Sequence, residues 1–344
     1  MVKAGQKITN KCKEILEKAI IVNGCEPQVY WEIRKRRYRG EKGIMEKVLF
    51  PIFNKGGISA IAASIYVPFP PLGFWDFKDA IRSIGVVNTD IEESKKTFLF
   101  ADNYAKIEAA KRRNKIAVIY FLQGLPPLEG ELYYLGIFFK LGVRIIQLTY
   151  NERNDIGDGC FEKSKGKLSN FGIEVVRELN RLGILIDLTH VGENSFYHVI
   201  EISNSPVVVS HSNCKRVCNH IRNLSDEQIC AVVQTGGVVG INAFPYHVKR
   251  INPSIKNVLD HIDHIVNLVG EDYVGLGLDL SYYTDEVGKY PDLYIPPSEK
   301  VKGLETPAQI PNIIQGLIER GHSRKTIMKI LGENFLRVYK CVFA

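Results

Sequence analysis

The segment Leu185–Asn223 reads LIDLTHVGENSFYHVIEISNSPVVVSHSNCKRVCNHIRN and decides the fold. It contains two short apolar runs, Leu185–Leu188 and Val207–Val209, and a polar cluster with a histidine follows each run. The residues between them carry apolar side chains near helical spacing, so the segment is predicted to form strand, helix and strand. In parallel α/β folds the carboxyl ends of the strands open onto the active-site face. His190 and His211, which follow the two runs, are therefore candidates for chemistry.

These histidines have two interpretations. One histidine beside a strand is more often a hydrogen-bonded core or loop residue than a ligand, whereas two at equivalent positions of successive strands favour a metal site. Arg222 follows on the loop or helix after the second strand. Its guanidinium could hold a carboxylate through two parallel hydrogen bonds, although on spacing alone a surface cation is the simpler interpretation.

Composition limits the class of protein. The chain has 344 residues, of which 45% are hydrophobic and 24% are charged, which is typical of a globular protein with a large core. No apolar run reaches the roughly 18 residues that a membrane span requires. The N-terminal residues resemble an amphipathic helix and lack the long apolar region of a secretory signal. Seven cysteines, an odd number, without such a signal favour free thiols and a cytoplasmic protein.

Two basic clusters, Arg34–Arg39 and Lys111–Lys115, contribute to the net charge of +7. Such clusters can attract phosphate or acidic ligands. Neither is accompanied by a nucleic-acid-binding motif or by aromatic side chains on which bases would stack. A solvated surface is the better interpretation, and no nucleic-acid partner is expected.

Eight short runs rich in β-branched residues lack polar alternation, as expected for strands covered on both faces. Helical patterns lie between them, including Thr89–Ala110 and Ser225–Gln234, which begins with a helix-start signal. The alternation predicts an α/β fold, a TIM (β/α)₈ barrel. An open doubly wound sheet is the alternative, but no glycine-rich dinucleotide motif supports it. The predicted strands are Ala19–Val22, Ile58–Tyr66, Ile116–Phe121, Val143–Leu148, Leu185–Leu188, Val207–Val209, Val238–Ile241 and Val274–Leu278.

No linker divides the chain, so a single barrel domain is expected over residues 1–344. Residues 1–18 would form an N-terminal helical extension, and residues 306–344 the C-terminal helices. The Pro/Gly-rich stretches Val67–Gly73 and Gly288–Pro297 are predicted to be loops that shape a substrate pocket. His261 and His264 lie in the helix before the last strand, on the outer ring, so we interpret them as structural.

In a barrel, the residues just past each strand converge on one mouth. Here they include two histidines, an aspartate and a cysteine, which together form a candidate divalent-metal site. Imidazole and thiolate suit zinc, and a carboxylate can serve as a ligand or as a base. The polar residues expected at the mouth are Cys25, Gln123, Tyr150, His190, His211, Asn242 and Asp279.

Six segments, in order along the chain, resemble the membrane dipeptidase (renal dipeptidase) family of metal-dependent amidohydrolase barrels. The resemblance extends from about Ala19 onward. It implies a barrel hydrolase with zinc, a dipeptide or similar small-molecule substrate, and a homodimer. The segments are GVRIIQLTYNERNDIGDG (Gly142–Gly159), LSNFGIEVVRELNRLGILIDLTHV (Leu168–Val191), SPVVVSHSNCKRVCNHIRNLSDEQ (Ser205–Gln228), GGVVGINAF (Gly236–Phe244), DHIDHIVNLVGEDYVGLGLD (Asp260–Asp279) and ILGENFLRVY (Ile330–Tyr339).

The resemblance assigns roles to individual residues. Enzymes of this family hold two zinc ions joined by a glutamate, and His190 and His211 match the two histidines of one metal. Arg222 matches the arginine that binds the substrate's terminal carboxylate. Asp279 matches the aspartate that handles the proton, so Arg222 and Asp279 are the expected catalytic residues. The side chains expected to contact the substrate are Arg222, Tyr150, Gln123 and Asn242.

The other half of the family's metal site is altered. The first strand of the family ends in a His-x-Asp motif, where this chain has Cys25 and Pro27. The bridging glutamate is replaced by Gln123, whose neutral amide cannot bridge two dications. Proline has no ligating side chain. We therefore expect at most one zinc, held by His190, His211 and Cys25, and binding of no metal is the alternative.

Three functions remain open from the sequence. The first is a dipeptidase-like hydrolase that uses one metal and acts on a substrate with a free carboxylate. The second is an enzyme of a specialised biosynthetic pathway that uses the same barrel for a non-hydrolytic reaction. The third is an inactive binding protein that has kept the pocket. The two retained histidines favour an enzyme, while the lost carboxylates argue against ordinary two-metal dipeptide hydrolysis.

Overall fold

The computed structural model describes residues 8–66, 76–280 and 299–343. Its sheet has nine strands, and each strand pairs with its neighbours in parallel. The pairing of β2 with β4 closes eight of them into a ring, which confirms the predicted (β/α)₈ barrel. The strands are β1 (Ile21–Glu26), β2 (Ile58–Tyr66), β3 (Phe98–Phe100), β4 (Ile116–Gln123), β5 (Val143–Gln147), β6 (Leu185–Asp187), β7 (Val208–Ser212), β8 (Val238–Ile241) and β9 (Val274–Leu276).

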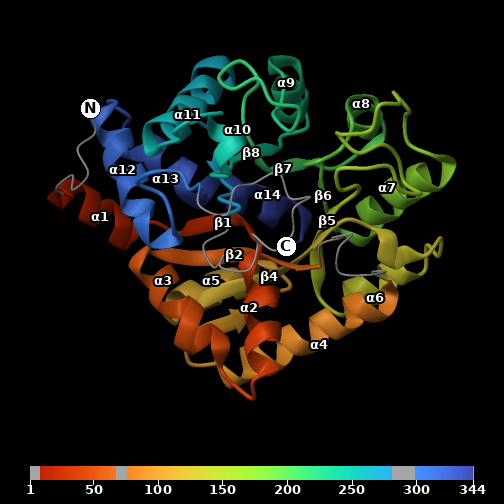
Figure 1. Ribbon diagram of the computed structural model, residues 1–344, viewed down its shortest axis with the longest axis horizontal. Helices are drawn as coiled ribbons and strands as arrows, with labels where there is room; N and C mark the ends of the chain where they lie inside the picture. Colours follow the sequence, from red (N-terminus) through yellow and green to blue (C-terminus); the bar gives the residue numbers. More distant parts are fainter. Residues whose placement is uncertain (1–7, 67–75, 281–298, 344) are drawn as a thin grey trace.

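Helices surround the sheet and cover the outward faces of the strands (Figure 1). Short π-helical segments at Met45–Leu49 and Lys329–Glu333 continue into α-helices, and 3₁₀ turns occupy Pro126–Leu128 and Pro307–Gln309. The α-helices are α1 (Asn10–Lys18), α2 (Gln28–Arg37), α3 (Phe50–Lys55), α4 (Phe77–Glu93), α5 (Tyr104–Arg112), α6 (Tyr134–Lys140), α7 (Asn170–Leu182), α8 (Glu193–Ile202), α9 (Asp226–Gln234), α10 (Pro245–Val248), α11 (Ile255–Val269), α12 (Ile310–Glu319), α13 (Arg324–Met328) and α14 (Asn334–Val342).

Local capping explains where the helices next to the site begin and end. The Ser225 side chain caps α9 in a capping box with Gln228, as the helix-start signal predicts. α7 begins after Ser169, whose side chain accepts a hydrogen bond from the Gly172 amide. It ends at Gly183 in the left-handed conformation, which glycine adopts without the steric cost of a Cβ. The turn at Gly183 leads directly into β6, which begins at Leu185.

The end of the barrel below the site is filled by one aromatic ring from α14. Phe335 is fully buried and packs among glycines of three neighbouring strands. A Cβ at Gly24, Gly240 or Gly275 would lie 2.6 to 3.1 Å from this ring, closer than packed atoms normally approach. The small residues of β1, β8 and β9 therefore leave the volume that the ring occupies.

Several predicted boundaries were wrong in ways that bear on the site. The range Thr89–Ala110 is not one helix, because it contains the end of α4, strand β3 and the start of α5. β3 pairs with the first residues of β4, while β5 pairs with its last. β1 runs to Glu26, although its Asn and Gly suggest a loop, since all six of its residues are buried. Cys25, Gln123 and His211 therefore lie within strands and not beyond them.

The first helix packs against the C-terminal part of the chain. α1 lies beside α12, where Thr9 donates two hydrogen bonds to Oε1 of Gln315 and the Cys12 thiol donates one to the Pro311 carbonyl (Figure 1). The two predicted pocket loops, Val67–Gly73 and Gly288–Pro297, fall outside the described residues. Over the residues that are described, no helix is both long enough and apolar enough to span a membrane.

The basic cluster at Arg34–Arg39 lies on α2 and the turn that follows it. Arg36 pairs with Glu32 and Glu41, and Arg37 pairs with Asp90 and Glu93. The Arg37 pairs join α2 to α4, so part of the cluster has a structural role.

Candidate metal centre and substrate cavity

Two imidazole rings face each other at the carboxyl ends of β6 and β7. His211 lies within β7, and His190 follows β6 by three residues. Both are buried, and their Nε2 atoms are 3.3 Å apart. The opposite ring nitrogens contact the protein. Nδ1 of His190 is 2.6 Å from Oδ1 of Asn151, and Nδ1 of His211 is 2.7 Å from Oγ of Ser210.

A buried carboxylate in β6 determines which nitrogen of His211 carries the proton. Asp187 accepts hydrogen bonds from the backbone amides and the hydroxyls of both Thr189 and Ser210. Because the Ser210 hydroxyl gives its proton to Asp187, its oxygen accepts one from Nδ1 of His211. The Asn151 carbonyl oxygen likewise accepts from Nδ1 of His190. Each Nε2 therefore turns a lone pair toward the other.

This arrangement suits a cation. Two lone pairs that face each other repel unless a positive charge lies between them. Two zinc–nitrogen bonds of about 2.05 Å at a tetrahedral angle would hold the nitrogens about 3.3 Å apart, and the observed separation is 3.3 Å. Burial and the Arg222 guanidinium hold the pKa values of His190 and His211 well below 6.5. Both rings are therefore neutral near pH 7, in the form that binds metal.

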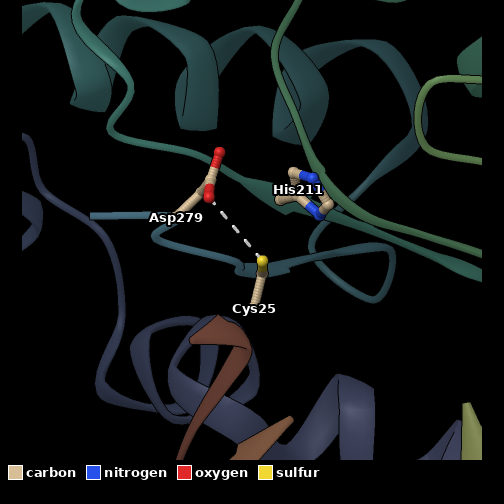
Figure 2. Close-up of side chains that lie close together, drawn as sticks. All are labelled: Cys25, His211 and Asp279. Carbon is tan, nitrogen blue, oxygen red and sulfur yellow. Dashed lines mark hydrogen bonds between the residues drawn. The ribbon is translucent and has the colours of Figure 1, made fainter. Parts of the chain in front are cut away.

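A second group of donors meets the first at His211. Figure 2 shows Cys25, His211 and Asp279 around a common space, and one ligand atom from each lies within 4.8 Å of the others. Sγ of Cys25 is 3.8 Å from Oδ1 of Asp279 and accepts a hydrogen bond of 3.1 Å from Nε2 of Gln123. Burial raises the pKa of the Cys25 thiol well above 9.0 and raises the pKa of Asp279 to about 7. Both groups thus hold their protons more tightly than in water, and a positive charge beside them would favour proton release.

Two residues of this centre have unusual backbone conformations. His190 has a φ of 67° and Asp279 a φ of 47°, both in the left-handed region that residues with a side chain rarely adopt. Such strain costs on the order of 1–3 kcal/mol per residue and is concentrated at functional sites. In both cases the residue lies just after a strand, where the turn directs its side chain over the end of the barrel.

A cavity of about 480 Å³ opens beside the histidine pair, between the loops that follow β5, β6 and β7. Arg222 lines it and is 4% exposed. Nη2 of Arg222 donates to the His211 carbonyl, but its Nε has no hydrogen-bond partner among the described residues. A buried guanidinium N–H without an acceptor is costly, so this group is suited to an acidic ligand in the cavity. Other lining residues include Cys160, His190, Gly192, Ser212 and Lys215.

Three other residues that were predicted to contact the substrate, Tyr150, Gln123 and Asn242, make contacts within the protein. The Tyr150 ring stacks on His190, with the ring centroids 4.2 Å apart, so it lies against the candidate metal centre. The Gln123 amide donates to Cys25 and to Ser64. The Asn242 side chain forms hydrogen bonds with Asn213 and His247, and its amide donates to the His211 backbone carbonyl. A direct contact of Gln123 or Asn242 with substrate stays a prediction.

Sequence reasoning missed the residues that hold the histidines in place. Asp187 is a fully buried carboxylate inside an apolar strand, and that position is itself a signal, because carboxylates are rarely buried without several donors. Ser64, at the end of β2, and Asn151, after β5, carry no comparable signal. Polar residues at barrel mouths are common, and only the fold brings these two beside Gln123 and His190.

The other histidine pair has structural partners. Nδ1 of His261 accepts from the Cys214 amide, and its Nε2 is 3.1 Å from the Val248 carbonyl. Nε2 of His264 pairs with Asp226 at the start of α9. Both histidines lie in α11, on the outer ring, and these contacts join α11 to its neighbours.

Comparison with known proteins decides the family. The model for the membrane dipeptidase family, peptidase family M19, matches residues 9–343. The chain belongs to this family. Dipeptidase tcpJ of Claviceps purpurea is 29% identical over 317 residues, which are 88% of this chain and 71% of the relative. An uncharacterised dipeptidase of Schizosaccharomyces pombe, C3A11.10c, is 33% identical over 265 residues, 76% of this chain and 61% of the relative. The M19 chain thus spans only part of the length of either relative.

Solved structures agree with this assignment. An amidohydrolase from Pseudomonas aeruginosa is 28% identical, with a TM-score of 0.81 over 96% of this chain and 99% of its own. A metallopeptidase from Rhodobacter sphaeroides, liganded with a phosphinate mimic of the dipeptide L-Ala-D-Ala, has the same TM-score at 20% identity. It covers 94% of this chain and 100% of its own, and at that identity it supports the fold alone.

The candidate cation ligands of this M19 chain centre on the two histidines. His190 and His211 present paired lone pairs with fixed tautomers, as a metal requires. At the position of the family's other metal, Pro27 offers no donor and the Gln123 amide directs its N–H groups at Cys25 and Ser64. N–H groups are positively polarised and repel a cation. Neither position therefore supplies an anionic ligand for a cation.

Proposed function

We propose that this M19-family chain is a dipeptidase-like hydrolase with at most one zinc ion, and that its substrate is a dipeptide or amino-acid derivative with a free carboxylate. One observation carries the proposal. The Nε2 atoms of His190 and His211 face each other, His190 and Arg222 line the same cavity, and the buried Nε of Arg222 has no hydrogen-bond partner among the described residues. A cation site next to a carboxylate site is what the hydrolysis of a small acid-ended substrate requires.

Arg222 is the proposed substrate anchor. Its guanidinium is buried, so a carboxylate that entered the cavity would be bound away from competing water. A planar guanidinium can hold a carboxylate through two parallel hydrogen bonds, which fixes the orientation of the substrate as well as its position. The stacked rings of Tyr150 and His190 form the adjoining surface against which the substrate would pack.

Asp279 is the proposed proton acceptor. Its pKa of about 7 lies near the physiological range, where a general base and acid is most effective. His190 and His211 would hold the zinc with Cys25 as a third ligand, and a zinc ion there would supply charge stabilisation and a reactive water at neutral pH. The protein's own contribution is to keep both imidazoles neutral and oriented through Asn151 and Ser210.

The proposal is tested by metal analysis of the purified protein together with amino-acid release from a panel of dipeptides. We expect no more than one zinc per chain, and hydrolysis that disappears when the dipeptide is replaced by its C-terminal amide. Two zinc ions per chain would contradict the one-metal site. Equal hydrolysis of the amides would contradict the role of Arg222. No hydrolysis of any dipeptide would favour a non-hydrolytic enzyme or a binding protein.

A second variant set tests whether the altered positions account for the difference from a two-metal site. The triple variant Cys25→His, Pro27→Asp and Gln123→Glu restores the ligand types of the family pattern. It should bind more zinc and hydrolyse dipeptides faster than the natural chain. A folded triple variant without that gain would show that other positions also differ.

A further inference from the structure

The cavity beside the histidine pair is lined by a second cation as well as by Arg222. Lys215 lines it and is half-buried. Among the described residues, its ammonium group has neither an ion-pair partner nor a hydrogen-bond acceptor. The buried Nε of Arg222 likewise lacks an acceptor within the described part of the chain. Two cationic side chains therefore line one cavity without an acidic partner from these parts of the protein.

Hydrogen bonds between two neighbouring segments of the chain hold these two residues close together. The Lys215 amide donates to the Leu224 carbonyl at 2.8 Å, and the Leu224 amide donates to the Asn213 carbonyl at 2.8 Å. Cys214 and Leu224 form an isolated parallel bridge. Residues 213–215 thus run beside residues 222–224, and the two cations reach the cavity from adjoining segments.

The Cys160 thiol indicates that both charges lie near one part of the cavity, whose lining includes Cys160. Burial raises the pKa of this thiol, and the charges of Arg222 and Lys215 both oppose that rise. Charges that act on the same buried thiol must both lie near it. The Cys160 amide donates to the His190 carbonyl at 2.7 Å, so this part of the cavity adjoins the candidate metal centre.

Three carboxylates also line the cavity, and none of them pairs with Lys215. Asp158 is buried, with its carboxylate 2.6 Å from Arg153 and 2.7 Å from the Gly166 amide that donates to it. Glu162 accepts a hydrogen bond from the amide of the next residue. Glu193 is exposed at the start of α8. The described acidic residues of the cavity therefore leave the two cations uncompensated.

We propose that Lys215 selects substrates whose C-terminal residue carries a second acidic group, so that the preferred dipeptides end in glutamate or aspartate. The inference deepens the proposed function, on which it rests for the binding of the terminal carboxylate by Arg222. The side-chain carboxylate of the same substrate residue would then bind the Lys215 ammonium. A guanidinium binds one carboxylate in a fixed plane, whereas an ammonium on a flexible stem can follow side chains of different length.

Discrimination arises from the charge that a neutral substrate would lack. A C-terminal glutamine has the size of glutamate, but its amide offers Lys215 a neutral oxygen in place of a charged one. A C-terminal lysine would bring a third positive charge to the same part of the cavity. Hydrogen bonds between charged groups are strong, and partial exposure weakens them, so we expect a preference for glutamate over glutamine of about fivefold or more.

Calorimetric titration with N-acetylglutamate and N-acetylglutamine tests the inference without hydrolysis. Both probes carry a free α-carboxylate, and they differ by one charge in the side chain. The natural chain should bind N-acetylglutamate with a Kd about fivefold or more lower. In Lys215→Met the two Kd values should converge, because binding of N-acetylglutamate weakens. Equal affinities in the natural chain, no measurable binding of either probe, or a preference that persists in Lys215→Met would overturn the proposal.

Two further variants separate charge from position. Lys215→Arg keeps the positive charge and should retain the preference for N-acetylglutamate. Lys167→Met is the matched control, since Lys167 is exposed in the loop between β5 and α7 and does not line the cavity. It should also retain the preference. If Lys215→Met does not fold, salt dependence decides: added salt should weaken binding of N-acetylglutamate to the natural chain more than binding of N-acetylglutamine, and equal weakening would refute the inference.

Hydrolysis of Ala-Glu and Ala-Gln distinguishes this inference from the proposed function. The natural chain should have the higher kcat/KM for Ala-Glu, and Lys215→Met should bring the ratio of the two values toward one. A binding preference that depends on Lys215, without hydrolysis of any dipeptide, would support the charge selection and refute the hydrolase. Equal hydrolysis of both dipeptides by the natural chain would refute the charge selection and leave the hydrolase in place.

Discussion

Asp187 influences the candidate metal centre indirectly. Through Ser210 it fixes which ring nitrogen of His211 carries the proton. Its carboxylate accepts the Ser210 hydroxyl proton, which obliges Ser210 to accept from Nδ1 of His211. In Asp187→Asn, the new amide N–H₂ can donate to Ser210, and the serine hydroxyl can then turn to donate to the histidine. His211 would be left with its proton on Nε2, where the metal must bind.

The expected loss of zinc affinity follows from this change in the position of the His211 proton. Loss of an outer-shell hydrogen bond of this kind lowers metal affinity about 10- to 100-fold, or about 1.4–2.8 kcal/mol. All four hydrogen bonds to Asp187 also lose their charged acceptor, and loss of the one from the Ser210 hydroxyl alone corresponds to about 1.5–3 kcal/mol of stability. Asp187→Asn should therefore fold, with a lower urea midpoint, and bind zinc much more weakly than the natural chain.

The assay is a chelator competition that measures zinc affinity, together with urea unfolding of the metal-free protein. Asp90→Asn is the matched control. Asp90 is also a fully buried carboxylate, and it accepts backbone hydrogen bonds from Ile44 and Met45, remote from the barrel mouth. Its variant should lose stability and keep its zinc affinity. If folded Asp187→Asn binds zinc within about twofold of the natural chain, the tautomer argument is wrong.

Three further predictions address other features of the molecule. Because the Asp279 pKa of about 7 lies above its ordinary 3.8, the folded metal-free protein holds a proton there that the unfolded chain has lost, so the contribution of Asp279 to the unfolding free energy should fall as pH rises from about 4 to 7. Urea unfolding over that interval should show less of this fall in Asp279→Asn. Arg222→Lys should lower kcat/KM for a dipeptide by about 10-fold or more, since lysine cannot form the paired hydrogen bonds, and the dipeptide amide should not be hydrolysed by either protein. Gly277→Ala should destabilise the protein by more than about 3 kcal/mol in thermal or urea unfolding, because its Cβ would lie 1.7 Å from the Ser210 carbonyl. Gly85→Ala, in α4 with no atom near the added Cβ, should be neutral or stabilising.

The fold could be read from the sequence because the signals for it are local. Six of the eight predicted runs overlap most of a barrel strand, since a strand buried on both faces is commonly a continuous apolar run. The exceptions are β1, where Asn23 belongs to a turn-like Asn-Gly pair but pairs with β2 and β9, and β7, whose last three residues are polar. β3 was missed because three residues between two helices have no periodicity of their own.

The candidate site was only partly accessible to the same reasoning. His190, His211, Arg222 and Asp279 follow from strand ends and from the family resemblance. The metal donors fall into two groups that share His211, however, and this depends on distances across the barrel that no spacing in the chain encodes. The unpaired Nε of Arg222 is likewise a property of what surrounds it.

The amino-acid sequence by itself determined the barrel, the family and the identity of the donor side chains, because hydrophobic periodicity and residue type are properties of a segment. It also determined that two anions of the family pattern are absent, at positions 27 and 123. The tertiary structure alone decided which donors meet, which nitrogen of each imidazole is free, and that a glutamine donates to Cys25. Those features arise where strands distant in the chain end side by side. Their energies depend on burial, which excludes the water that would otherwise weaken them.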